Sequence, residues 1–472
     1  MTTFCRRETR ALTRREMLAQ SGVGFGWLAL ATLLGEEAAR AAEAANPLAP
    51  KKPHFAPRAK RVIFLFMHGG PSQVDTFDPK PLLTRENGKP YSGPRPRVVF
   101  AQTGNLLKSP WEFRKYGQSG IEVSDLFPEV GKRVDDLCIL RSLHADNTAH
   151  GGALLQLHTG SDTFVRPSMG SWVTYGLGTE NQNLPGFVTI CPTLGHGGVQ
   201  NWSSAFLPAY AQGTPIGNAA IKARDAKLAH LQSDLPAEIQ RAQLDLLATM
   251  DREQQLHWGV DPQLESRISS FELAFRMQRE APTLMDIDAE SKATKDLYGI
   301  GTEPTDDFGR QCLLARRFCE AGVRFVQVTH SYKWDQHGNL KNDHEKNARE
   351  VDKPIAGLLT DLKARGLLED TLVLWGGEFG RTPTAQGGDG RDHNPHGFTM
   401  WMAGAGVKKG FVYGGTDDFG WFAQEDKMHV HDLHATLLHL LGIDHTRLTY
   451  RYAGRDFRLT DVHGVVAKKI LS

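Results

Sequence analysis

The chain has 472 residues, of which 40% are hydrophobic and 23% are charged, and its formal net charge is +1 at pH 7. This balance of charge excludes the basic field that nucleic-acid binding requires, and it also excludes an acidic tail. The length allows a large buried core, and the spacing of the five cysteines suits neither a zinc knuckle nor a dense disulfide framework.

The N-terminal segment is typical of a twin-arginine leader. Arg14 and Arg15 precede a Gly- and Ala-rich apolar run at 23–34, and the small residues AEA at 42–44 offer a cleavage site. We therefore expect residues 1–44 to be a signal peptide read by the twin-arginine translocase, and the mature protein to be exported to the periplasm or beyond. The alternative is a membrane anchor, but the run is shorter than the roughly 20 residues of a bilayer span. No other segment is long and apolar enough, so no stable membrane span is expected in the mature chain.

Strands and helices alternate after a linker at 45–60. RVIFLFM at 61–67 has the composition of a buried strand and ends in a Gly-Gly-Pro turn. The stretch 126–144 fits a helix and then a strand that ends near His144. AHGGALLQLHTG at 149–160 fits a turn that enters a helix.

Residues of about 205–300 differ in character, because their apolar residues recur at helical spacing and strand-like runs are missing. We expect a helical insertion there, which could form a cap over the site. Alternation then resumes with helices predicted at 306–323, 345–371 and 431–443 and strands at 324–330, 372–377 and 398–407. Such alternation predicts an α/β fold with a mostly parallel sheet covered on both faces, built by residues 61–472 as one domain.

Acids and histidines follow four of the predicted strands or their turns. Ligands of parallel sheets collect beyond the carboxyl ends of the strands, so these side chains are expected to converge. The predicted metal ligands are His68, Asp75, Asp335, His337, Glu378, His393 and His396. Mixed carboxylate and imidazole donors suit one or two divalent ions, with zinc, manganese, iron, magnesium and calcium all open.

Other roles are open for several of these residues. A single histidine is more often a packed or surface residue than a ligand, and Glu378 could instead pair with Arg381. His429 and His431 precede the helix predicted at 431–443, where Asp432 could be the N-cap instead of part of a metal site.

Three motifs resemble the alkaline phosphatase and sulfatase superfamily. They are IAGLLTDLKARGLLEDTLVLWGGEFGRT, HDLHATLLHLLGI and HGGALLQLHTG, and their order and spacing match that superfamily. More narrowly, the leader together with HGGPSQVDTFDPKP, WDQHGN, GGEFGRTP and DHNPHG is similar to an uncharacterised exported bacterial sulfatase-like family. The resemblance implies an alkaline-phosphatase-like three-layer α/β/α sandwich with a metal centre at the strand ends.

The resemblance also assigns positions within the metal centre. Glu378 takes the place of the aspartate in the superfamily's Asp-His-Gly, while Phe379 takes the histidine position and cannot bind metal. His68 stands at the first aspartate ligand, and His393 stands at the final histidine. Asp335 resembles the aspartate of an Asp-plus-His pair, with His337 as its partner.

The superfamily nucleophile is replaced in this chain. His150 stands where sulfatases have the formylglycine-forming cysteine, so chemistry of that type is not expected. His150 could be a nucleophile, a further ligand or a general acid, and the hydroxyl of Thr148 could serve instead. Leu154 replaces the signature arginine, which leaves anion binding to the metals, Arg381 and the main-chain amides at Gly151 and Gly152.

The resulting hypothesis is an exported metal-dependent hydrolase of phosphate or sulfate esters. Its substrate would be a small-molecule or polysaccharide anionic ester. Two alternatives stay open: a non-catalytic exported binding protein on the same fold, and a metal-dependent lyase or mutase.

Overall fold

The computed structural model describes residues 46–94, 96, 102–229, 231, 233–258 and 262–472. The predicted signal peptide at 1–44 lies outside these residues. Within the described part of the chain, no helix has the combined length and apolarity that crossing a bilayer requires.

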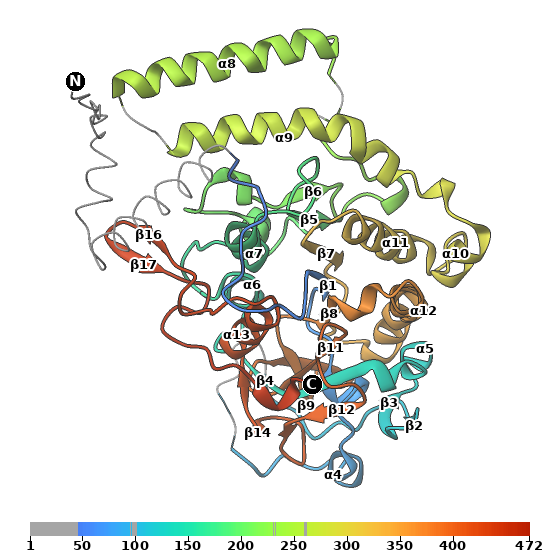
Figure 1. Cartoon of the computed structure of the whole chain (residues 1–472). Coiled ribbons are helices and arrows are strands. Elements are labelled where there is room, and N and C mark those ends of the chain that lie inside the picture. Colours follow the sequence, from blue (N-terminus) through green and yellow to red (C-terminus); the bar gives the residue numbers. More distant parts are fainter. Residues whose placement is uncertain (1–45, 95, 97–101, 230, 232, 259–261) are drawn as a thin grey trace, which may run out of the picture.

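A nine-stranded sheet forms the centre of the described chain, and most of its strand pairs are parallel (Figure 1). β11 alone runs antiparallel to both of its neighbours, β4 and β8. In spatial order the strands are β12 (Phe411–Tyr413), β4 (Leu137–His144), β11 (Phe398–Ala403), β8 (Thr371–Gly376), β1 (Arg61–Met67), β7 (Phe325–His330), β5 (Phe187–Ile190) and β6 (Thr214–Ile216), with β15 (Met428–His429) beside β4. This confirms the predicted α/β fold with a mostly parallel sheet.

The sheet lies between two helical layers because its strands are apolar on both faces. In β1, Val62, Phe64 and Phe66 pack into one core, whereas Ile63, Leu65 and Met67 pack into the other. Helices α6 (His150–Thr159), α7 (Met169–Leu177) and α13 (Val430–Leu440) cover the first face. Helices α11 (Asp306–Glu320) and α12 (Leu340–Ala364) cover the second, and Figure 1 shows the two sets on opposite sides of the strands.

A long helical hairpin projects from one end of this sandwich. It consists of α8 (Ala237–Trp258) and α9 (Pro262–Met285), and α8 is the outermost element in Figure 1. The range expected to be a helical insertion thus holds these helices and α10 (Lys292–Leu297), and it also holds the edge strand β6.

The segment after β8 forms an antiparallel hairpin of β9 (Gly380–Gln386) and β10 (Gly390–Asn394), which places His393 opposite Arg381. Gly387 and Gly388 adopt positive φ in the turn that closes this hairpin.

The remaining described α-helices and strands are short. They are α3 (Gln73–Thr76), α4 (Pro81–Arg85), β2 (Phe113–Tyr116), β3 (Ile121–Ser124), α5 (Pro128–Gly131), β13 (Gly415–Thr416), β14 (Ala423–Glu425), β16 (Tyr450–Tyr452) and β17 (Arg455–Phe457).

Candidate metal centre

Six of the predicted site residues meet beyond the carboxyl ends of β8, β1 and β7, which are neighbours in the sheet. His68 directly follows β1, the turn Asp335–His337 follows β7, and Glu378 follows β8. His150 is the first residue of α6, and His393 lies on β10. Residues far apart in sequence are therefore brought to one edge of the sheet, as expected for a parallel arrangement.

Two glycines allow the turn after β1 to approach its neighbours closely. Gly69 has a φ of +115°, and a Cβ there would lie 2.8 Å from the backbone nitrogens of Trp334 and Asp335. Its N–H donates to the two carboxylate oxygens of Glu378 at 3.0 and 3.2 Å. The turns after β1, β7 and β8 are therefore in direct backbone contact, which a side chain at Gly69 would prevent.

Glu378 and His150 form a buried pair at the base of the cluster. Glu378 is fully buried, and its Oε1 lies 2.6 Å from Nδ1 of His150. Burial alone would raise the pKa of Glu378, but the hydrogen bond with His150 and the nearby His68 lower it to about 2. Burial opposes the charged form of His150, yet its hydrogen bonds with Asp335 and Glu378 outweigh burial and raise its pKa.

Asp335 is the centre of the cluster. Its Oδ1 lies 3.2, 2.9 and 3.1 Å from the Nε2 atoms of three histidines, His150, His337 and His393. Arg381 approaches the same oxygen at 2.6 Å. Burial would raise the pKa of this carboxyl, but the three histidines and Arg381 hold it far below its ordinary value. Three ring nitrogens thus lie around one carboxylate oxygen. This arrangement is expected of a carboxylate that is a ligand of two cations.

The ring of His393 is fixed through both of its nitrogens. Its Nδ1 lies 2.7 Å from the carbonyl oxygen of Thr148, which can only accept, so Nδ1 carries a hydrogen. Its Nε2 lies 3.1 Å from Oδ1 of Asp335 and 3.0 Å from Nε2 of His337. Burial lowers the pKa of His393, and the hydrogen bond with Asp335 opposes this. Phe379 stacks on the His393 ring with centroids 4.4 Å apart and fixes its plane.

His68 provides an unpaired donor on the other side of His150. It is fully buried, and among the described residues neither of its ring nitrogens has a hydrogen-bond partner. Burial lowers its pKa to about 4, so the imidazole is neutral at pH 7. Its ligand nitrogen lies within 4.8 Å of ligand atoms of both His150 and Glu378. A buried imidazole without a hydrogen bond is costly, and a cation at this position would satisfy it.

The residues present therefore fit a divalent metal. Three overlapping sets have ligand atoms within 4.8 Å of one another: His68, His150 and Glu378; His150, Asp335 and His393; and His337, Asp392 and His393. Two of these sets share His150 and two share His393. The geometry accordingly offers one or two ion positions close together.

Other surroundings are found for four predicted site residues: Asp75, His396, Thr148 and Arg381. Asp75 is fully buried and pairs with Arg391, with nitrogen–oxygen distances of 2.7 and 3.1 Å, so the structure does not bring it to the cluster. His396 lies outside the described ligand sets and packs against Phe422. Thr148 contacts the cluster through its carbonyl oxygen.

Arg381 was expected to bind the substrate anion, and its position contradicts this. Its side chain is completely buried and donates to the carbonyl oxygens of Gly69, Gly70 and Trp334 as well as to Asp335. A guanidinium enclosed in this way stabilises the turns that carry the ligands and does not face a substrate.

The family comparison agrees with the extent of this domain. A family model described as protein of unknown function (DUF1501) matches residues 59–471. The chain belongs to this family. A search of the curated proteins gave no match.

Three solved structures show what the chain is similar to at low sequence identity. The lipoteichoic acid synthase LtaP from Listeria monocytogenes is 9% identical over 87% of this chain and 78% of that one, with a TM-score of 0.35. The PsFucS1 sulfatase from Pseudoalteromonas sp. is 13% identical over 86% and 70%, with a TM-score of 0.33. The alkaline phosphatase of the Antarctic bacterium TAB5 is 10% identical over 83% and 99%, with a TM-score of 0.32. Similarity of this size says nothing about what the site binds.

The sequence interpretation missed three residues at the site. His196 stacks on His150 with centroids 5.0 Å apart, and the hydroxyl of Tyr332 donates to Oδ2 of Asp335 at 2.8 Å. Asp392 belongs to one of the ligand sets. Tyr332 follows β7 and His196 lies in a Gly-rich turn after β5, so the strand-end rule used for the other ligands also indicates these two. Both are exposed, and they mark the side of the cluster that is open to solvent.

Proposed function

We propose that this chain is an exported, metal-dependent hydrolase of phosphate or sulfate esters. The observation that carries the proposal is His68, which is completely buried and has no hydrogen-bond partner on either ring nitrogen among the described residues. A buried imidazole in this state is costly unless a cation binds it. Its ligand nitrogen lies within 4.8 Å of ligand atoms of His150 and Glu378, which could bind the same cation.

The proposed ligands divide into two neighbouring groups. His68, His150 and Glu378 would hold one ion, and Asp335 with His393 would hold another. His337 and Asp392 would complete or orient the second group. Neutral imidazole donors favour zinc, manganese or iron over magnesium and calcium. Such ions supply charge that polarises a phosphoryl or sulfuryl group and lowers the pKa of a water molecule.

The N-terminus of α6 supports an anionic substrate beside these ions. His150 begins this helix, so its first backbone N–H groups and positive dipole end lie at the cluster. Gly151 has open space around it, since no described atom beyond its chain neighbours and the backbone of its own helix lies within 4 Å of where its Cβ would be. With Arg381 enclosed, the anion would rest on the ions and on these backbone groups.

The position of His150 argues against a nucleophilic role. Its two ring nitrogens lie 2.6 Å from Glu378 and 3.2 Å from Asp335, so neither is directed to solvent. We therefore assign His150 to ligand and positioning roles. The attacking group would be water or the hydroxyl of Thr148, a half-buried residue adjacent to the cluster.

The proposal that the chain is exported rests on residues 1–44, and it is tested separately from the metal centre. Replacing Arg14 and Arg15 by lysine is expected to retain the chain in the cytoplasm of a host that has the twin-arginine pathway. Export of this variant at the level of the parent would overturn the proposed route without bearing on the metal centre.

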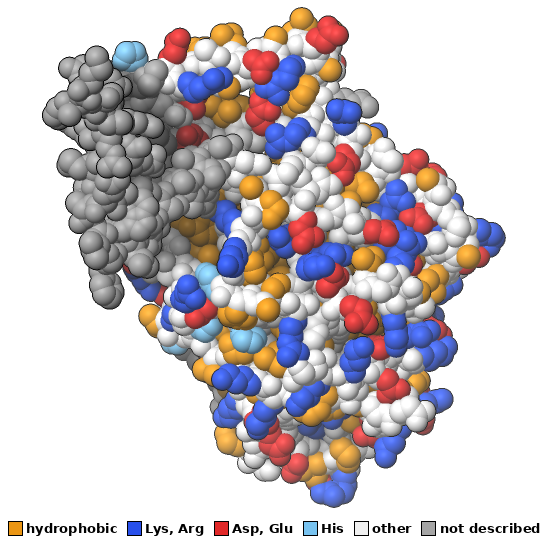
Figure 2. Space-filling model, in the orientation of Figure 1, with side chains coloured by type: hydrophobic (Ala, Val, Ile, Leu, Met, Phe, Trp, Pro, Cys, Tyr) orange, Lys and Arg blue, Asp and Glu red, His pale blue; other side chains and the backbone are white. Residues whose placement is uncertain are grey.

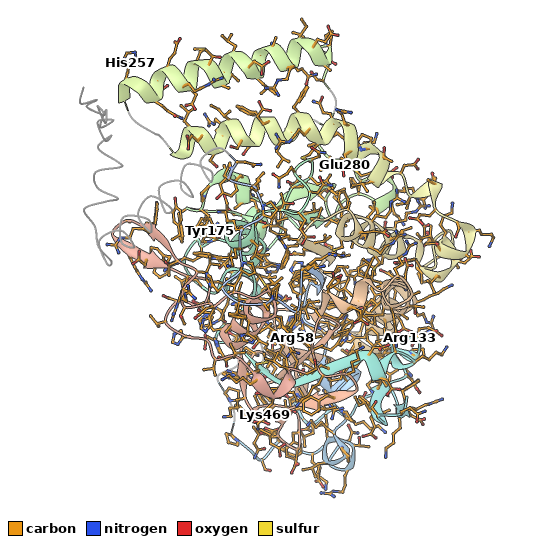
Figure 3. The ribbon with its side chains drawn as sticks, viewed as in Figure 1. Arg58, Arg133, Tyr175, His257, Glu280 and Lys469 are labelled. Carbon is orange, nitrogen blue, oxygen red and sulfur yellow. The ribbon has the colours of Figure 1, made fainter. Side chains whose placement is uncertain are left out.

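The hydrolase proposal is tested on purified residues 46–472. Metal content is measured by elemental analysis, and activity is measured on nitrophenyl phosphate, a nitrophenyl phosphodiester and nitrophenyl sulfate. Glu378→Gln and His393→Gln are expected to lose metal and at least about 100-fold in kcat/KM. The control is His257→Ala, because His257 lies at the far end of α8 (Figure 3) and should leave both quantities unchanged.

Two outcomes would refute the proposal. A folded preparation that binds no divalent ion at any tested concentration contradicts the metal centre. A protein that is fully loaded with metal but inactive on all three esters contradicts the proposed hydrolase activity. It would favour the binding-protein alternative or the lyase or mutase alternative.

A further inference from the structure

The closed end of the β9–β10 hairpin packs directly against the turn that follows β7. The backbone N–H of Asn339 donates to Oδ1 of Asp389 at 3.1 Å. Gly390 makes the closest approach, because a Cβ at this position would lie 2.0 Å from the carbonyl oxygen of His337. The hairpin is therefore held beside His337, one of the residues of the candidate metal centre.

Gln386 is the side chain of this hairpin that contacts the ring of His337. It is the last residue of β9 and lies opposite Gly390. Its Oε1 lies 2.5 Å from Nδ1 of His337, and a carbonyl oxygen can only accept, so Nδ1 carries a hydrogen. Oδ1 of Asp392 lies 3.9 Å from the same nitrogen, which is too far for a hydrogen bond, so this carboxylate does not replace Gln386.

The bond with Gln386 turns the other ring nitrogen of His337 to the cluster. Nε2 lies 2.9 Å from Oδ1 of Asp335 and 3.0 Å from Nε2 of His393. His393 is oriented in the same way, since its Nδ1 donates to the carbonyl oxygen of Thr148. When Nδ1 carries a hydrogen, Nε2 is the nitrogen that can bind a cation. Both rings therefore present Nε2 beside one carboxylate oxygen.

We propose that Gln386 is a positioning residue for the second ion, the one that Asp335 and His393 would hold. Through its bond with Nδ1 it makes His337 a ligand of that ion through Nε2. The inference rests on the proposed metal centre and deepens it, because it assigns His337 to coordination. The partner of His393 is a main-chain carbonyl, which side-chain substitution does not remove, whereas the amide of Gln386 can be replaced.

The competing interpretation is that Gln386 only stabilises the hairpin. The side chain of His337 is 33% exposed, so water can hydrogen-bond to Nδ1 once the amide is removed. Gln386→Leu should therefore unfold at nearly the same denaturant concentration as the parent when both are kept in excess chelator. Its affinity for the ion should fall nonetheless, because the ring is then free to rotate and to change its tautomer.

The test withdraws zinc from the loaded protein. Purified residues 46–472 are saturated with zinc, and increasing amounts of a chromophoric chelator then report the number of ions and the dissociation constant of each. Gln386→Leu should weaken one ion by about 10- to 100-fold and leave the other unchanged. Gln386→Glu should keep at least the affinity of the parent, because its carboxylate accepts the same hydrogen.

The matched control is Gln254→Leu, which makes the same substitution far from the cluster. Gln254 is exposed on α8, the outermost helix, and Figure 2 shows that the surface there already mixes charged and hydrophobic side chains. This variant should release both ions as the parent does.

A double-mutant cycle with His337 shows whether Gln386 acts through this ring. His337→Ala should weaken the same ion, and adding Gln386→Leu should then cause no further loss. Adding Gln386→Glu to His337→Ala should give no gain, which separates the effect of the hydrogen bond from the general attraction of a new negative charge.

The possible results distinguish this inference from the proposed function. A parent that holds zinc as tightly as Gln386→Leu does would overturn the inference and leave the proposed metal centre intact. A further loss from Gln386→Leu in the His337→Ala protein, or a gain from Gln386→Glu in it, would also overturn the inference. A parent that holds no zinc would overturn the metal centre and the inference together.

Discussion

Replacing Asp75 by alanine is expected to destabilise the protein strongly while leaving its metal content unchanged. Asp75 and Arg391 are both completely buried and lie 2.7 and 3.1 Å apart at their two contacts. Ser72 also donates to Asp75, and Arg391 donates to the carbonyl oxygens of Thr382 and Leu107. Removing the carboxylate leaves a guanidinium with backbone acceptors but without its counter-charge. Breaking a buried pair in this way costs about 3 to 5 kcal/mol.

The loss in the free energy of unfolding depends on whether one partner of the pair is removed or both. Asp75→Leu combined with Arg391→Met removes both charges and should cost clearly less than the two single changes together, because no charge is then left unpaired. The free energy of unfolding is measured by chemical denaturation of the parent, the single variants and the double variant at one fixed metal concentration. Elemental analysis of each folded variant gives the metal content.

This prediction separates the two interpretations of Asp75. The sequence made it a metal ligand, and the structure makes it the partner of Arg391. If Asp75→Ala loses metal but keeps the unfolding free energy of the parent, then the ion-pair interpretation is wrong and Asp75 is a ligand. Additive costs in the double variant would also contradict a coupled pair.

Three further predictions concern the metal centre and the core. Removing the ions with a chelator should lower the free energy of unfolding, since His68 then stays buried without a partner; an unchanged unfolding curve would contradict this. Gly69→Ala should cost about 1 to 3 kcal/mol and lose metal because its Cβ meets backbone, whereas Gly120→Ala, also at positive φ but with open space around it, should keep the metal. Burial lowers the pKa of both His344 and His434 to about 3, so between pH 6.5 and pH 3 the unfolded chain binds more protons, and stability should fall as the pH falls through this window. Each histidine would account for about 2 kcal/mol at pH 5, and His344→Gln should make the stability–pH slope shallower; an unchanged slope would contradict the assignment.

Periodicity was sufficient to predict the sandwich. A central strand of a parallel sheet is covered on both faces, so nearly every position in it is apolar. The apolar run at 61–67 has this pattern and therefore predicted a central strand. The alternation of elements also predicted helices at 306–323 and 431–443, which the structure has at 306–320 and 430–440. The β9–β10 hairpin was missed because its residues are polar and include Pro383, which gives no strand pattern.

The strand-end rule predicted which residues come near the cluster but not where their side chains point. His68 and Glu378 lie within two residues of a strand, where the sheet fixes their direction. Asp75 lies farther along, in α3, which turns it to Arg391. Arg381 was assigned to the substrate on its charge alone, and only the three-dimensional structure shows the carbonyl groups that enclose it.

The buried guanidinium of Arg381 also sets the charge balance of the cluster. Three carboxylates, Asp335, Glu378 and Asp392, and this one guanidinium leave two negative charges in excess when the histidines are neutral. A single divalent ion would only neutralise this excess, whereas two would make the enclosed region positive. Attraction of an anionic ester over a distance therefore requires the second ion, so affinity for anions should depend on metal concentration more steeply than a one-ion site would allow.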